Sequence, residues 1–233
     1  RQAIAAVEPF ARAGYDTAAA AVLLCESDGA PDEVRHEIER VRQVLEAAGV
    51  RHIHVSQNEA ERLRLWAGRK AAFPAVGRLT PDYLCMDGTI PRKRLGEMLS
   101  AIAAMEQKYR LRCANVFHAG DGNLHPLIMF DASDKQEMAR ALAFGADVLE
   151  LSVALGGTIT GEHGVGIEKL AQMCVQFTPE ELAAFAGVKA AFDPLGLLNP
   201  GKVIPTIARC REYRQTGGAQ RRDGRNRAAR VNA

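Results

Sequence analysis

The sequence is poor in aromatic residues and has no long apolar run. Phe, Tyr and Trp make up 6% of its 233 residues, and there is a single tryptophan. No stretch approaches the roughly 18 apolar residues of a membrane-spanning helix, and the first residues lack the apolar core of a signal peptide. We therefore expect a globular protein of the cytoplasm, at most peripherally attached to a membrane.

The five cysteines are few and widely spaced. They are Cys25, Cys85, Cys113, Cys174 and Cys210, an odd number without a Cys-x-x-Cys pair. This pattern indicates neither a disulfide framework nor a structural zinc site, and it favours a reducing compartment. We expect Cys85, Cys113 and Cys174 to act as small apolar residues.

Charge is unevenly distributed along the chain. Residues 209–233 hold eight arginines against Glu212 and Asp223, a charge of +6, so the remaining residues carry −4 of the overall +2. Such a tail has too little apolar surface to fold and is predicted to be disordered. Arginine-rich tails can bind RNA, but we favour a solvated tail and expect no nucleic-acid partner.

Two histidines bracket a turn in residues 115–126 and form half of a predicted metal site. Residues 114–118 and 124–130 have the pattern of short strands, and the Gly-Asp-Gly-Asn run between them is typical of a turn. His118 and His125 would then face each other across a hairpin. Neutral imidazoles suit a divalent first-row metal, which takes three protein ligands when one position stays open for substrate.

The third ligand is predicted in a glycine-rich run, residues 156–166, where a carboxylate and an imidazole are adjacent. Glu162 would complete a metal shell with His118 and His125, and this donor set suits Zn, Mn or Fe alike. His163 points elsewhere if the backbone is extended, so it would be free to act as a general base. The spacing is not His-Glu-x-x-His on a helix, and we do not predict a zinc protease.

Short strands alternate with amphipathic helices along the chain. Helices are expected at 2–13, 34–48, 60–72, 95–105, 134–155 and 178–192, and strands at 19–25, 52–55 and 83–87 besides the hairpin. Thr178 and Glu181 have the spacing of a capping box. This order predicts an α+β fold, residues 1–208, in which helices pack on one face of a largely antiparallel sheet.

Several runs resemble the C-terminal part of FAD-linked 2-hydroxyacid oxidases and dehydrogenases of the vanillyl-alcohol oxidase type. They are residues 117–125 (Phe-His-Ala-Gly-Asp-Gly-Asn-Leu-His), 160–164 (Thr-Gly-Glu-His-Gly) and 192–202 (Phe-Asp-Pro-Leu-Gly-Leu-Leu-Asn-Pro-Gly-Lys). Residues 66–78 and 86–91 are most similar to the flavin-containing subunits of bacterial glycolate oxidases. The resemblance runs in order from residue 3 to residue 210.

The resemblance implies that the chain is the cap, or substrate, domain of such an enzyme, with a ferredoxin-like fold and a C-terminal helical segment. In the family an FAD-binding domain precedes the cap, and nothing here resembles it. We therefore expect a truncated chain, inactive in isolation. The implied partners are the missing FAD domain, a small 2-hydroxy acid, and electron-transfer subunits, one with a second flavin domain and one with iron–sulfur clusters.

The resemblance also assigns roles to residues. His118, His125 and Glu162 resemble the ligands of metal-containing members, His163 resembles the catalytic base, and Arg69 resembles the group that binds the substrate carboxylate. The cap residues that touch the flavin are matched by Asn199, Gly164, Val165 and Gly166. Some relatives differ after the second histidine, where this chain has Pro126 and Leu127, and near Cys85, which leaves details of the substrate pocket open.

The chemistry expected of these residues is the oxidation of glycolate or D-lactate to the 2-oxo acid. A 2-hydroxy acid chelates a divalent metal through its carboxylate and hydroxyl, which lowers the pKa of the hydroxyl. His163 would take the proton, and the flavin would accept the hydride because side chains cannot. Two alternatives stay open: a dehydrogenase of D-2-hydroxyglutarate or another D-2-hydroxy acid, and a catalytically silent assembly module that keeps the metal site.

Overall fold

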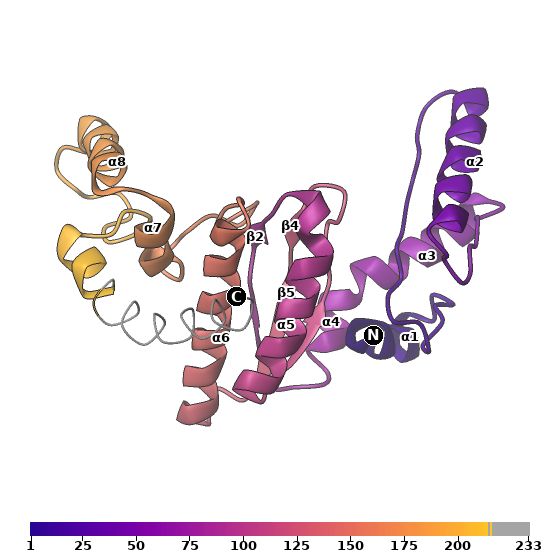
Figure 1. Cartoon of the computed structure of the whole chain (residues 1–233), viewed down its shortest axis with the longest axis horizontal. Coiled ribbons are helices and arrows are strands. Elements are labelled where there is room, and N and C mark those ends of the chain that lie inside the picture. The colour runs from indigo at the N-terminus through magenta and orange to yellow at the C-terminus, as the bar shows by residue number, and fades with distance from the viewer. Residues whose placement is uncertain (214, 216–233) are drawn as a thin grey trace, which may run out of the picture. The chain divides into compact units, whose positions relative to one another are not determined.

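A computed structural model describes residues 1–213 and 215. The chain divides into two compact units, Arg1–Leu79 and a second unit that begins at Thr80 (Figure 1). Residues 207–213 are helical, so this helix crosses the boundary predicted at residue 208. The remainder of the predicted tail, apart from residue 215, lies outside the described residues.

The first unit is built from helices. They are α1 (Gln2–Ala11), α2 (Pro31–Ala47), α3 (Glu59–Lys70) and α4 (Ala72–Val76). Helix α1 packs against α3 and α4, and its residues Ile4 and Val7, three positions apart, are both buried. The helices predicted at 2–13, 34–48 and 60–72 are confirmed with shorter or shifted ends.

The strands predicted at 19–25 and 52–55 are wrong. Every residue from 1 to 79 is described, and none of them lies in a strand. Residues 19–25 form an irregular segment in which the side chains of Val22 and Leu23 are 39% and 59% exposed. An apolar run has the propensity for a strand, but a strand also needs a second strand to pair with its backbone groups.

The second unit contains a three-stranded antiparallel sheet in the order β1-β5-β3. The strands are β1 (Asp82–Cys85), β3 (Arg112–Asn115) and β5 (Pro126–Phe130). Asn115 lies opposite Pro126 in the β3–β5 pair, so the predicted hairpin is confirmed. A second small sheet pairs β2 (Gly88–Thr89) with β4 (Asn123–Leu124).

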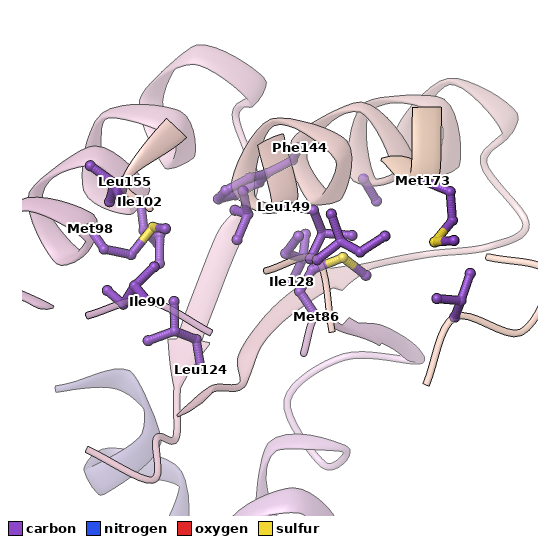
Figure 2. Close-up of a cluster of buried hydrophobic side chains, with 14 of the residues drawn as sticks. Met86, Ile90, Met98, Ile102, Leu124, Ile128, Phe144, Leu149, Leu155 and Met173 are labelled. Atoms are coloured by element: carbon purple, nitrogen blue, oxygen red, sulfur yellow. The ribbon is translucent and has the colours of Figure 1, made fainter. Parts of the chain in front are cut away.

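Five helical elements lie between residues 80 and 199 of the second unit, and two of them, α5 and α6, pack on its strands. The five elements are the 3-10 turn η1 (Arg92–Arg94), α5 (Leu95–Tyr109), α6 (Lys135–Ala154), α7 (Leu170–Gln176) and α8 (Pro179–Phe192). Helix α6 packs on β1 and β5, and α5 on β3 and α6. Figure 2 shows Phe144 and Leu149 of α6 above Ile128 of β5, beside Met86. The α+β prediction is confirmed, with the helices and antiparallel strands forming one apolar core.

Helix α8 begins where the sequence predicts. Thr178 Oγ1 accepts a hydrogen bond from the Glu181 backbone N–H at 3.2 Å, and Glu181 Oε2 accepts one from the Thr178 N–H at 2.8 Å. This reciprocal pair is the capping box, and it satisfies two backbone donors that the first turn leaves unpaired. The helix ends before Asp193, whose side chain accepts from the N–H groups of Leu197 and Leu198.

One prediction about the cysteines is wrong. Cys174 of α7 and Cys210 are joined in a disulfide, with their Cα atoms 5.2 Å apart. The two residues are 36 positions apart, and sequence spacing alone does not reveal that the fold brings them together. Cys113 is buried and Cys85 half-buried, as expected of small apolar residues.

Candidate functional site

The hairpin after β3 holds His118 and His125 on either side of its turn. The His118 N–H donates to the Asn123 carbonyl at 3.0 Å, and the Asp121 N–H donates to the His118 carbonyl at 3.0 Å. Gly122 has a φ of +73°, and a Cβ there would lie 2.1 Å from the Ile90 carbonyl oxygen. Glycine is therefore needed at this turn for its conformation and for space.

A second segment brings Glu162 and His163 to the same place. This segment follows the C-terminal end of α6. In it, Thr158 pairs with Thr89 of β2 through reciprocal backbone hydrogen bonds of 3.0 Å. Gly161 then passes so close to the hairpin that a Cβ would lie 2.6 Å from Asn123 Oδ1. The two glycine-rich runs, far apart in sequence, thus meet side by side.

Three imidazoles converge on one carboxylate oxygen. The distance to Glu162 Oε1 is 2.8 Å from His125 Nε2, 3.6 Å from His163 Nε2 and 3.8 Å from His118 Nε2. Two donors bound to one ion at the usual distances lie about 3 to 3.5 Å apart, so these separations fit a shared metal with small adjustments. The structure brings together the four residues that the sequence singled out in its two motifs.

The ring planes distinguish the three histidines. His118 and His125 meet edge to face at 87°, with centroids 5.4 Å apart, whereas His125 and His163 stack at 6°, with centroids 4.8 Å apart. A metal binds in the plane of an imidazole, along the lone pair of its nitrogen. Stacked parallel rings have no common in-plane point, and this favours His118 as the second imidazole ligand beside His125. The distances between ligand atoms favour His163 instead: those of Asp87, His125, Glu162 and His163 lie within 4.8 Å of one another, and His118 is not in that group.

Burial separates these side chains further. His125 is 2% exposed, whereas His118, His163 and Glu162 are 45%, 44% and 52% exposed. Burial lowers the pKa of His125, and the neighbouring His163 acts in the same direction, against the hydrogen bond with Glu162. His125 is therefore held in the neutral form, which is the form that binds a metal.

Beneath the cluster lies a buried carboxylate that sequence reasoning missed. Asp87 follows β1 and accepts hydrogen bonds from Thr160 Oγ1 and from the backbone N–H groups of residues 161–163, at 2.8 to 3.0 Å. Lys169 Nζ, also buried, lies 3.0 Å from Asp87 Oδ2. Burial alone would raise the pKa of Asp87, but these hydrogen bonds outweigh it and hold the pKa well below its ordinary range.

The signal for Asp87 was present but ambiguous, since one Asp before a glycine is also a common turn. Lys169 carried no signal at all, because a lysine near a helix start is by default a surface residue. Cys85 was considered only as an apolar residue, yet its Sγ lies within 4.8 Å of ligand nitrogens of His125 and His163. Burial and the charge of Asp87 raise the pKa of Cys85 to about 12.

The other predicted site residues lie elsewhere in the chain. Arg69 is half-buried in the last turn of α3 in the first unit, where Tyr15 accepts a hydrogen bond from its backbone. Asn199 is exposed and has a φ of +45°, a conformation that Asn tolerates better than most residues. Residues 164–166 follow His163 directly, and Val165 alone among them is buried.

Comparison with known proteins places this chain in one family. The family model described as "FAD linked oxidases, C-terminal domain" matches residues 1–203. The glycolate oxidase subunit GlcD of Escherichia coli K12 is 58% identical over 210 residues, which are 90% of this chain and 42% of that protein. GlcD of Bacillus subtilis is 38% identical over 205 residues, 88% of this chain and 44% of that protein.

A more distant relative and a solved structure are also similar to this chain. The mitochondrial D-lactate dehydrogenase (cytochrome) of Arabidopsis thaliana is 29% identical over 194 residues, 82% of this chain and 34% of that protein. Among solved structures, 4-ethylphenol oxidase from Gulosibacter chungangensis superposes with a TM-score of 0.51 at 15% identity, covering 75% of this chain and 38% of that one. That likeness shows the fold alone. The chain spans less than half the length of these relatives, and it belongs to the family of FAD-linked oxidases, as their C-terminal domain.

Proposed function

We propose that this chain is the substrate-domain part of an FAD-dependent enzyme that oxidises a small 2-hydroxy acid, glycolate or D-lactate, with the help of a divalent metal. The observation that carries the proposal is the convergence of three Nε2 atoms on Glu162 Oε1 within 3.8 Å. The relatives named for glycolate and D-lactate supply the substrate class.

The proposed metal ligands are His118, His125 and Glu162. The perpendicular rings of the two histidines and the neutral state of His125 support this set. When bound, the metal would polarise the substrate oxygens and the flavin would accept the hydride. Two nitrogens and one carboxylate oxygen leave a position open for substrate, as catalytic metal sites require.

His163 is proposed as the general base. Its ring is stacked on His125 and shares no in-plane point with it, so its nitrogen stays available for a proton while its position is fixed. Nε2 lies 3.6 Å from Glu162 Oε1, so the proposed base is close to one of the residues that would hold the metal. The ring is 44% exposed, so the proton can return to solvent after the reaction.

The remaining roles rest on chemistry and family membership. Arg69 offers a planar fork of N–H donors that matches a carboxylate better than a lysine would, and we propose it for the substrate carboxylate. Asn199 and residues 164–166 are proposed to contact the flavin. The GlcD relatives are named as subunits, which supports partners that carry electrons onward.

The cellular location is likewise proposed from the sequence. Among the described residues no helix is long and apolar enough to cross a membrane. We propose a cytoplasmic enzyme that contacts the membrane peripherally if at all.

Metal content tests the ligand set. We expect about one equivalent of Zn, Mn or Fe by mass spectrometry of the purified chain, and loss of that metal in a His118→Ala, His125→Ala double variant. The matched control is His36→Ala, His54→Ala, which removes two exposed histidines of the first unit. Equal metal loss in both variants, or no metal in the folded chain, would contradict the assignment.

Activity is assayed together with an FAD-binding domain. We would replace the matching segment of Escherichia coli GlcD with this chain and assay dye reduction by glycolate and by D-lactate. A working general base contributes about 10²–10⁴-fold, so His163→Ala in the chimera should lower kcat by that factor while His54→Ala leaves it unchanged. A folded, FAD-loaded chimera that oxidises neither substrate would refute the proposal.

A further inference from the structure

We propose that Asp87, neutralised by Lys169, is the positioning residue that sets the direction of Glu162 and His163. This inference rests on the metal-assisted function proposed above and names the groups that prepare its site. It assigns Asp87 and Lys169 no contact with substrate. Their role is exerted through the backbone of the segment that carries a metal ligand and the base.

The first observation is how many consecutive backbone groups one carboxylate holds. Asp87 accepts the N–H groups of residues 161–163 at 2.9 to 3.0 Å, and its own carbonyl accepts the Gly161 N–H at 2.9 Å. Fixing three successive peptide N–H vectors fixes the planes between them. The Cα–Cβ directions of Glu162 and His163 follow from those planes.

The second observation is that few side-chain contacts hold these two residues: Glu162 has its hydrogen bond with His125 Nε2 at 2.8 Å, and His163 has its stacking on the His125 ring. Glu162 and His163 are 52% and 44% exposed, so packing does not restrict them as it restricts the buried His125. Outer groups that orient the inner ligands are a general need of metal sites, because ligands that turn freely bind more weakly. At this site Asp87 orients Glu162 and His163 through the backbone N–H groups of their segment.

The third observation is charge balance. A carboxylate that is fully buried is costly unless it is paired, and Lys169 Nζ lies 3.0 Å from Asp87 Oδ2 and 3.2 Å from Thr160 Oγ1. Thr160 in turn donates to Asp87 Oδ2 at 2.8 Å. Lys169 therefore keeps the carboxylate ionised where it must accept several hydrogen bonds at once.

An alternative is that Asp87 is itself a metal ligand, since its carboxylate lies within 4.8 Å of ligand atoms of His125, Glu162 and His163. The hydrogen bonds argue against it. Oδ2 already accepts from a hydroxyl, two backbone N–H groups and an ammonium, and Oδ1 accepts from the Glu162 N–H. Oδ2, with four donors around it, is not available to a cation, whereas Oδ1 accepts from one donor only.

The test uses Co²⁺ as a spectroscopic probe of the full 233-residue chain. Affinity and the ligand-field absorption band are measured for the wild type and for Asp87→Asn. Removing an outer partner of a metal ligand lowers affinity about 10–100-fold, and we expect that loss together with an altered band. The control is Asp147→Asn, the same change at a carboxylate that contacts Lys108 and Tyr109, which should alter neither. Thr160→Val is a milder variant, in case Asp87→Asn does not fold, and should give a smaller loss of the same kind.

Amide hydrogen exchange gives a second readout that needs no metal. In Asp87→Asn the N–H groups of residues 161–163 should exchange faster, while those of β5 keep their wild-type rates. Faster exchange with unchanged Co²⁺ affinity and spectrum would overturn the positioning role and leave a structural one. If the wild type binds no Co²⁺, the proposed metal site fails, and exchange then decides: unchanged rates at residues 161–163 would overturn this inference as well.

Discussion

Replacing Lys169 by Met should destabilise the protein far more than the same change at an exposed ion pair. The side chains of Lys169 and Asp87 are 4% and 0% exposed. Met keeps most of the aliphatic volume, so the change removes the charge and the hydrogen bonds to Asp87 and Thr160 while leaving the carboxylate buried. Breaking one side of a buried pair costs about 3–5 kcal/mol, a large part of the 5–15 kcal/mol typical of a domain.

The matched control is Lys108→Met. Lys108 Nζ lies 2.6 Å from Asp147 Oδ2, with the lysine side chain 60% and the aspartate side chain 15% exposed. Because solvent reaches the lysine, we expect this pair to contribute about 1 kcal/mol, near the upper end for exposed pairs. Urea unfolding followed by circular dichroism gives both free energies of unfolding. The Lys169→Met, Asp87→Asn double variant should be more stable than Lys169→Met alone, because it no longer buries an unpaired charge.

The reasoning would be refuted by a Lys169→Met cost within about 1 kcal/mol of the Lys108→Met cost. It would also fail if the double variant were less stable than the wild type by the sum of the costs of the two single variants. That result would mean that the two residues do not interact.

Three further predictions concern the cysteines and a helix end. Cys85, with its pKa of about 12, should react slowly with iodoacetamide at pH 8 and about tenfold faster per pH unit above that, provided the fold persists. Exposed Cys25 should be alkylated first, and mass spectrometry of peptides shows the order; equal rates would contradict the assigned burial. Replacing both Cys174 and Cys210 by Ala opens a link between residues 36 apart, which should cost about 2–4 kcal/mol in urea unfolding, and a wild-type mass equal to that of the reduced chain would rule the disulfide out. Thr178→Ala removes the N-cap of α8 and should cost about 1 kcal/mol, whereas Thr178→Ser should restore most of it.

The sequence by itself predicted the helices and the hairpin well. Helix α8 was predicted from Thr178 and Glu181, because a capping box depends on residues three apart. The turn at Gly122 was predicted because positive φ is a local property of the chain. Strands 19–25 and 52–55 were predicted by the same local reasoning and are wrong, since a strand depends on a partner that the segment itself does not specify.

The sequence also indicated the residues of the candidate site, while the tertiary structure determined their arrangement. Two glycine-rich motifs indicated His118, His125, Glu162 and His163 from residue type alone. Their convergence on one oxygen, and the perpendicular and stacked rings on which the proposed ligand and base roles rest, arise only when the hairpin and the segment after α6 pack together. Asp87 is central to the site for the same reason: one carboxylate gains its role from five hydrogen-bond donors located more than 70 positions away in the chain, and no local pattern encodes such a contact.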